Sequence, residues 1–386
     1  MTDQARRTRW IGAIAVAAVL ALGAYSFWPR TPDSTDADAA AAHTPIPKID
    51  VHVHVAPSLA AQAVDILREN GIEIALNASG GVPGGGLELS LRAATETDGH
   101  LLPYCNFAFG RVVEPDFAAY TERTLTTCKQ SGAVGLKVFK AVGLGITLDD
   151  GSLLTADDPR LDVVFETAGR LGMPVLIHTG DPKAFFLPPT PDNERYDELR
   201  AHPAWSFYGE RPNGDPWPAW DVVFAQYERR VARHPHTTFV GAHFGNAPEE
   251  PERVARMLAR YPNLVIDTAA RVPEIGRRPP AEMRAFFVRF RKRILFGSDL
   301  SVTTEGLTLG SGGERPSTRP EARPFFDRQW RYFDTAGRRM PSPTPIQGRW
   351  TIDGINLPRP VLEDLYYRNA ARIFHLTMPT ASRGRT

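Results

Sequence analysis

The run Ile49-Asp50-Val51-His52-Val53-His54 places a histidine at every second position of a short apolar stretch. Residues i and i+2 of a β-strand point to the same face, so the run predicts a strand with His52 and His54 side by side, about 7 Å apart. Two neighbouring imidazoles can bind one metal ion such as zinc, copper, iron or nickel. The alternative is a half-exposed strand in which histidines alternate with valines by chance, and the pair alone does not decide between the two.

Downstream of this run, apolar segments typical of strands alternate with amphipathic segments typical of helices. The strand-like segments are 72–76, 101–109, 134–139, 174–178, 238–242, 264–268 and 294–296. The helical segments between them are 58–70, 87–95, 117–129, 161–171, 222–232, 251–260 and 281–291. With the histidine run this makes eight strands, which predicts an α/β chain folded as a single (β/α)8 TIM barrel with long βα loops. A doubly wound open sheet is the alternative, but no glycine-rich phosphate turn follows an early strand.

Composition limits the classes of function. The chain has 386 residues, of which 42% are hydrophobic, enough for a large core. A formal net charge of +1 gives no bulk field that would attract nucleic acid. The two cysteines, Cys105 and Cys128, have no zinc-finger spacing and could pair or stay free.

The amino-terminal segment has the pattern of a membrane-targeting or export signal. Three arginines precede an apolar run over 10–28 that is long enough to cross a bilayer. We expect residues 1–30 to be an uncleaved transmembrane anchor that holds the barrel outside the cytoplasm, in the periplasm or another extracytoplasmic space. A cleaved signal peptide, which would export the protein, is the alternative. Residues 31–47 read as a flexible tether, 48–376 as the barrel and 377–386 as a disordered tail.

Polar residues follow several of the predicted strands. In (β/α)8 barrels the catalytic groups lie at the carboxyl ends of the strands. His54, His178, His243 and Asp299 each stand at such an end, and Lys137 lies within the fourth strand. One histidine after an apolar run is usually structural, but several groups at the same end of different strands predict a shared site.

Taken together, these motifs resemble the amidohydrolase superfamily. The resemblance rests on Asp50-Val51-His52-Val53-His54, on His178 and His243 after strands five and six, and on Gly297-Ser298-Asp299 at strand eight. The segment 367–374 resembles the end of the amidohydrolase-related branch, which includes enzymes of the aminocarboxymuconate-semialdehyde decarboxylase type. The resemblance covers roughly residues 48–376. The family that it points to includes hydrolases, decarboxylases and hydratases.

The resemblance also implies a metal site and roles for its residues. It implies that His52, His54, His178 and Asp299 bind a metal, with His243 as an acid/base or as a ligand of a second ion. Members with two metals use a carboxylated lysine on strand four as the bridge, and Lys137 stands at that position, whereas other members keep one metal. This ligand set suits zinc best, with manganese or iron as alternatives. A divalent ion lowers the pKa of water towards neutrality, and Asp299 could then act as the general base.

We therefore expect a metal-dependent hydrolase that attacks a C–N or C–O bond of a small carboxylic amide, ester or lactone. A decarboxylase or hydratase built on the same site is the main alternative, and a membrane-tethered barrel that binds without turnover is the third. The expected partner is a small-molecule substrate. The sequence leaves open whether the chain forms a homo-oligomer.

Two long insertions and two arginines are candidates for contact with the substrate. The insertion over 181–220 is rich in aromatic residues, among them Trp205 and Trp217, and reads either as a lid over the barrel mouth or as packing on its rim. The second insertion covers 301–350. Arg111 follows strand three and Arg271 follows strand seven, so either could bind a substrate carboxylate. A surface role is the favoured alternative for each, because the chain has many arginines.

Overall fold

The structure of the chain, a computed structural model, describes residues 45–313 and 315–377. Within these residues, eight strands alternate with helices, and successive neighbours pair in parallel. The strands are β1 (Lys48–Val55), β2 (Ile72–Asn77), β3 (Leu101–Pro103), β4 (Leu136–Val138), β5 (Val175–Ile177), β6 (Phe239–Gly241), β7 (Leu264–Asp267) and β8 (Ile294–Leu295).

Backbone hydrogen bonds close these strands into a barrel. Between β3 and β4 the amide of Cys105 donates to the carbonyl of Gly135 at 2.8 Å. Between β8 and β1 the amide of Val51 donates to the carbonyl of Phe296 at 3.0 Å. The predicted (β/α)8 barrel is therefore confirmed, and the open sheet is not the fold.

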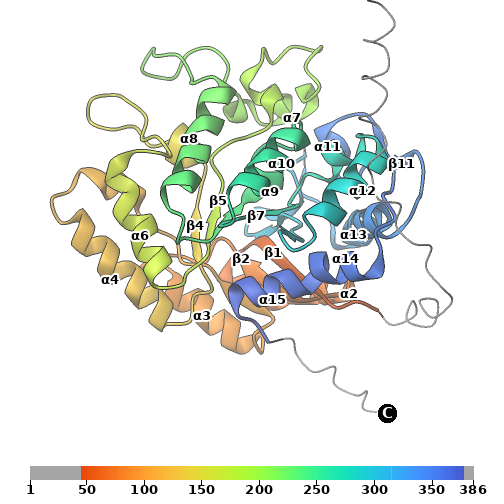
Figure 1. Cartoon of the computed structure of the whole chain (residues 1–386), viewed down its shortest axis with the longest axis horizontal. Coiled ribbons are helices and arrows are strands. Elements are labelled where there is room, and N and C mark those ends of the chain that lie inside the picture. Colours follow the sequence, from red (N-terminus) through yellow and green to blue (C-terminus); the bar gives the residue numbers. More distant parts are fainter. Residues whose placement is uncertain (1–44, 314, 378–386) are drawn as a thin grey trace, which may run out of the picture. The chain divides into compact units, whose positions relative to one another are not determined.

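Helices surround the strands, as Figure 1 shows. Their buried faces carry the expected helical spacing, for example Val254, Met257 and Leu258 in α10. The connecting helices are α2 (Ala60–Glu69), α3 (Leu87–Glu96), α4 (Phe117–Gln130), α6 (Asp162–Arg170), α8 (Trp220–Arg233), α10 (Pro251–Arg260) and α12 (Pro280–Arg289). Shorter helices near the barrel mouth are α5 (Ala141–Leu144), α7 (Tyr196–Ala201), α9 (Ala242–Gly245) and α11 (Val272–Gly276). The chain ends with α13 (Arg319–Asp334), α14 (Arg359–Glu363) and α15 (Asn369–Phe374).

The barrel interior is apolar at its amino end and polar at its carboxyl end. One side chain from nearly every strand fills the apolar layer, including Ile49, Leu176, Val240, Val265 and Leu295. Helix α15 covers this layer, and its Phe374 meets the ring of Tyr104 edge to face at 5.7 Å. With this end filled, the opposite end is left for a site.

The second insertion differs from its expected loop-like character. It contains the hairpin β9 (Leu300–Thr303) and β10 (Gly306–Leu309), the 16-residue helix α13, and the short pair β11 (Met340–Pro341) and β12 (Thr351–Ile352). Prolines and arginines hide α13 in the sequence, but Thr318 and Glu321 form a capping box at its start. Its buried side chains Ala322, Phe325 and Phe326 recur at helical spacing.

Predicted strand ends were less accurate than predicted helices. The third strand was predicted over 101–109, whereas β3 ends at Pro103 and the chain turns into the short helix η2 (Phe109–Val113). Strand β9 extends the sheet by pairing in parallel with β1, so the hairpin of the second insertion lies beside the histidine run.

Two further predictions concern the chain outside the barrel core. Cys105 and Cys128 form a disulfide, which answers the question that their spacing left open. No helix among the described residues is both long enough and apolar enough to span a membrane. The predicted anchor over 1–30, the predicted tether up to residue 44 and the predicted tail from residue 378 lie outside the described residues.

Candidate metal centre and pocket

An irregularity in β1 brings the histidine pair into the barrel. Ile49 and Val51 belong to the apolar layer inside the barrel, and Val53 packs in the outer core. Strict alternation would turn His52 away from the side that Val51 occupies, but the register with β2 shifts between Asp50 and Val53. Such bulges re-aim side chains next to active sites. The rings of His52 and His54 lie 5.4 Å apart, centre to centre.

Asp299 completes a group that could hold a metal ion. Its Oδ1 lies 3.5 Å from His54 Nε2 and 3.8 Å from His52 Nε2. One nitrogen or oxygen from each of the three residues lies within 4.8 Å of the others. The backbone of Asp299 has a φ of 61°, a costly conformation for a residue with a side chain, and its amide donates to the carbonyl of His52 at 2.9 Å. Loss of bulk water raises the pKa of Asp299, an effect that a bound cation would oppose.

A residue that the sequence did not single out, Asp267, orients His52. Its Oδ2 lies 2.9 Å from His52 Nδ1, and both side chains are fully buried. Its Oδ1 accepts from the amides of His243 at 2.7 Å and Ala269 at 3.1 Å. Burial holds the pKa of His52 well below its ordinary value, so the ring is neutral and donates from Nδ1. Its Nε2 lone pair then faces His54 and Asp299, as in carboxylate–histidine–metal arrangements.

Lys137 reaches the same nitrogen from β4. Its Nζ lies 3.0 Å from His52 Nε2, and the side chain is buried. Burial lowers the pKa of this lysine, and the charges of Asp267 and Asp299 oppose the shift. The predicted bridging lysine is thus next to the three-residue group, and its amine is easier to deprotonate than that of an ordinary lysine.

His178 and His243 lie beside the group. Their rings are 4.3 Å apart, and the ring of His243 is 4.9 Å from that of His52. His243 Nδ1 donates to the carbonyl of Ala269 at 2.9 Å, and burial lowers its pKa, so its Nε2 carries a lone pair. His178 Nε2 is buried without a hydrogen-bond partner and lies 3.3 Å from Asp181 Oδ1. His178 Nε2 thus faces the carboxylate of Asp181, and His178 is not part of the three-residue group.

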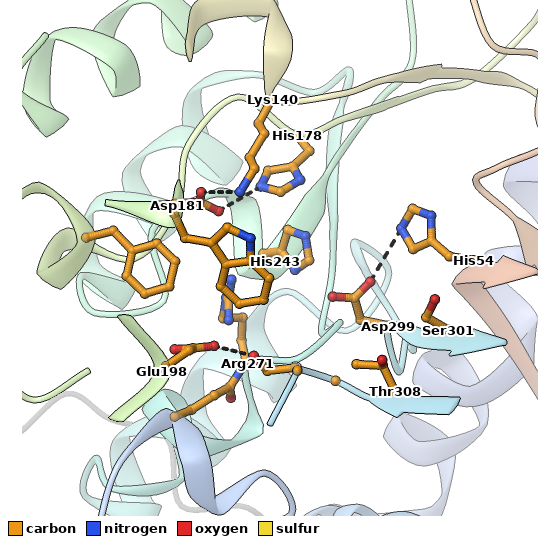
Figure 2. A pocket seen from close by; sticks show the side chains of 16 residues that line it. His54, Lys140, His178, Asp181, Glu198, His243, Arg271, Asp299, Ser301 and Thr308 are labelled. Atoms are coloured by element: carbon orange, nitrogen blue, oxygen red, sulfur yellow. Dashed lines mark hydrogen bonds and ion pairs between the residues drawn. The ribbon is translucent and has the colours of Figure 1, made fainter. Parts of the chain in front are cut away.

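These residues open into a cavity of about 230 Å³, drawn in Figure 2. One end is formed by His54, His178, His243 and Asp299. The β9–β10 hairpin and the segment after it contribute small polar residues, among them Ser301, Thr308 and Ser311. A cavity of this size suits a small molecule.

The two candidate arginines have different positions. Arg271 lines the cavity and is 6% exposed. Arg111 does not line it: η2 directs its side chain to Glu114 and Asp116, and a third of that side chain is exposed. Of the two interpretations of Arg111, a substrate contact and a surface role, this position fits the surface role, because Glu114 and Asp116 hold the side chain outside the cavity lining.

The aromatic insertion is partly a lid. Phe185 and Trp205 line the cavity. Trp217 instead packs edge to face against Phe207, with ring centres 5.0 Å apart, in a small apolar cluster of the insertion. Both predicted alternatives hold, each for different residues.

Comparison with known proteins identifies the family. Residues 84–376 match the model of an amidohydrolase family, Amidohydro_2. The match includes Lys137, His178, His243 and Asp299 and begins after the His52–His54 run. No curated protein matches the chain significantly.

Solved structures with similar folds are distant in sequence. A zinc-bound amidohydrolase from Burkholderia multivorans is 12% identical, with a TM-score of 0.47, and the alignment covers 86% of this chain and 100% of that one. A probable 2-pyrone-4,6-dicarboxylic acid hydrolase from Acinetobacter baumannii with bound citric acid is 13% identical, with a TM-score of 0.46 and coverage of 85% and 99%. The IDCase of Metarhizium anisopliae is 11% identical, with a TM-score of 0.45 and coverage of 82% and 78%.

Proposed function

This chain belongs to the amidohydrolase family, and we propose that it is a metal-dependent hydrolase of a small carboxylic amide, ester or lactone. The observation that carries the proposal is the convergence of His52, His54 and Asp299, whose ligand atoms lie within 4.8 Å of one another beside the cavity. Asp267 supports it, because a buried carboxylate that fixes the tautomer of a histidine is typical of metal sites.

The metal would be held by His52, His54 and Asp299, with His178 as the proposed fourth ligand. Three imidazoles and a carboxylate suit zinc, with manganese or iron as alternatives. When bound, such an ion polarises a carbonyl and lowers the pKa of water. A second ion would need His243 and a carboxylated Lys137 as additional ligands.

Asp299 and His243 would carry the proton transfers of the proposed hydrolysis. Asp299 takes a proton from water, and the water oxygen bonds to the carbonyl carbon of the substrate. The C–N or C–O bond breaks, and the leaving nitrogen or oxygen receives the proton. Neutral His243 can accept a proton at its free Nε2 and pass it on to the leaving group, and the apolar layer below keeps bulk water from the amino end of the barrel.

A lyase on the same site is the second candidate, because Arg271 points into the cavity. An inward arginine beside a single metal and an unmodified Lys137 would fit a decarboxylase or hydratase. A panel of amides, lactones and aromatic acids, assayed with the metal-loaded protein, distinguishes the candidates through acid release or carbon dioxide release. Asp299→Asn and His243→Asn should abolish or depress whichever activity is found.

We also propose that the barrel works outside the cytoplasm. The Cys105–Cys128 disulfide supports this, because disulfides persist mainly in oxidising compartments. The apolar run over 10–28 after three arginines supports export or anchoring. Cell fractionation, with thiol alkylation before any reductant is added, tests both points, and a cytoplasmic protein with two free thiols would contradict them.

A further inference from the structure

Arg271 is a buried cation whose hydrogen-bonding capacity is largely unused. It follows β7 at the start of α11 and lines the cavity, with 6% of its surface exposed. Nη1 donates to the carbonyl of Ala270 at 3.2 Å, and Nε has no hydrogen-bond partner. A buried guanidinium normally makes several hydrogen bonds, so this arrangement fits a ligand that supplies the missing acceptors.

Two of the acidic residues near Arg271, Glu198 and Glu274, are paired with another arginine. Fully buried Arg195 contacts Glu198 through Nη1 at 2.7 Å and forms an ion pair with Glu274 through Nη2. Glu198 also accepts from the hydroxyl of Ser311. The ion pair of Arg271 with Glu274 is a long one, 3.9 Å from Nη1 to Oε1.

Electrostatics of the remaining cavity agree with this reading. Burial, and next the charge of Arg195, lower the pKa of Arg271, whereas the charges of Glu198, Glu249 and Asp181 raise it. Lys140, the other lysine or arginine among the described residues of the cavity wall, is paired with Asp181 at 2.6 Å. The charge of Arg271 also lowers the pKa of Asp299, so the two groups influence each other within one cavity.

We propose that Arg271 binds a carboxylate of the substrate, so that the substrate is a small carboxylic acid whose reacting group lies towards His54 and Asp299. A guanidinium binds a carboxylate through two parallel hydrogen bonds. A single guanidinium close to the acidic groups Glu198 and Asp299 favours a monoanion over a phosphate dianion. Trp205 lines the same cavity, and its ring is stacked on His202 with ring centres 4.0 Å apart. This inference rests on the proposed function for the position of the reacting group.

Benzoate and benzamide provide a direct test, because they share shape and differ in charge. Titration calorimetry on the metal-loaded, full-length protein should show that benzoate binds about tenfold more tightly than benzamide. Arg271→Lys keeps the charge but loses the paired hydrogen bonds, and it should weaken benzoate binding about tenfold without changing benzamide binding. Arg111→Met, the matched control on the surface, should leave both affinities unchanged.

Three results would overturn the proposal: no binding of benzoate, equal affinity of the wild type for both compounds, or unchanged benzoate affinity in Arg271→Lys. The comparison within the wild type does not depend on the folding of any variant. If benzoate binds to the metal instead, the preference of the protein for benzoate over benzamide should disappear when a chelator removes the metal. The same preference should then persist in Arg271→Lys. If the protein holds no metal but its preference for benzoate still requires Arg271, this inference stands and the proposed hydrolase function fails.

Discussion

Asp267→Asn should weaken metal binding about 10- to 100-fold while preserving the fold. The two carboxylate oxygens of Asp267 have separate tasks. Oδ1 accepts from the amides of His243 and Ala269, and Oδ2 accepts from His52 Nδ1. In the asparagine variant, the amide oxygen can keep both backbone hydrogen bonds, so the NH2 group must face His52.

This substitution reverses the tautomer of His52. The asparagine NH2 would donate to Nδ1, which moves the ring proton to Nε2, the nitrogen that faces His54 and Asp299. A protonated Nε2 cannot bind a metal, and the expected loss of affinity corresponds to about 1.4–2.8 kcal/mol. Asp267→Ala should do more damage, because it leaves three buried donors without an acceptor at about 1–3 kcal/mol each.

The assay is a competition titration with a chromophoric chelator, combined with thermal unfolding of the metal-free proteins. Asp364→Asn is the matched control, since this equally buried carboxylate pairs with Arg291 and Lys292 away from the cavity. It should lower stability and leave metal affinity unchanged. If Asp267→Asn binds metal as tightly as the wild type, the orienting role of Asp267 is refuted.

Three other predictions follow from the structure. Trp205→Ala should change the KM or kcat for any substrate that is found, whereas Trp217→Ala should act mainly on stability; identical kinetic effects would place both rings in the same role. Reduction of the Cys105–Cys128 disulfide, which links residues 23 positions apart, should lower the free energy of unfolding by about 3 kcal/mol in urea titrations, and a Cys105→Ser/Cys128→Ser variant should be insensitive to reductant. Lys137→Met should retain its metal if the site holds one ion, whereas loss of about half the metal by elemental analysis would show a carboxylated bridge between two ions.

Much of the barrel and its histidines could be predicted because they follow simple periods. Period-2 alternation marks His52 and His54, and strand ends mark His178, His243 and Asp299. Asp267 ends the apolar segment Leu264–Asp267 in the same way. Its role was missed because it depends on the closed barrel, in which β8 alone separates β7 from β1, and no local pattern reports this closure. The prediction could have been made by treating every polar residue at a strand end as a candidate.

The two arginines show a second limit. Arg111 and Arg271 both follow strands, and their local sequences do not rank them. Arg111 is turned away by η2 and held by two nearby carboxylates, whereas Arg271 stays in the barrel mouth because Arg195 occupies two of the acidic residues near it. Arg195 comes from an insertion about 75 positions away in the sequence, a separation over which side-chain pairing cannot be inferred without the fold.

The central claim is that His52, His54 and Asp299 hold a divalent ion. Elemental analysis of the purified wild type and of His54→Ala, after identical loading with zinc, manganese or iron, tests it most directly. The account predicts at least about one ion per chain in the wild type and loss of most of it in His54→Ala, because a site with too few ligands loses both geometry and charge. A wild-type protein that holds no stoichiometric metal under any of these conditions would contradict the account.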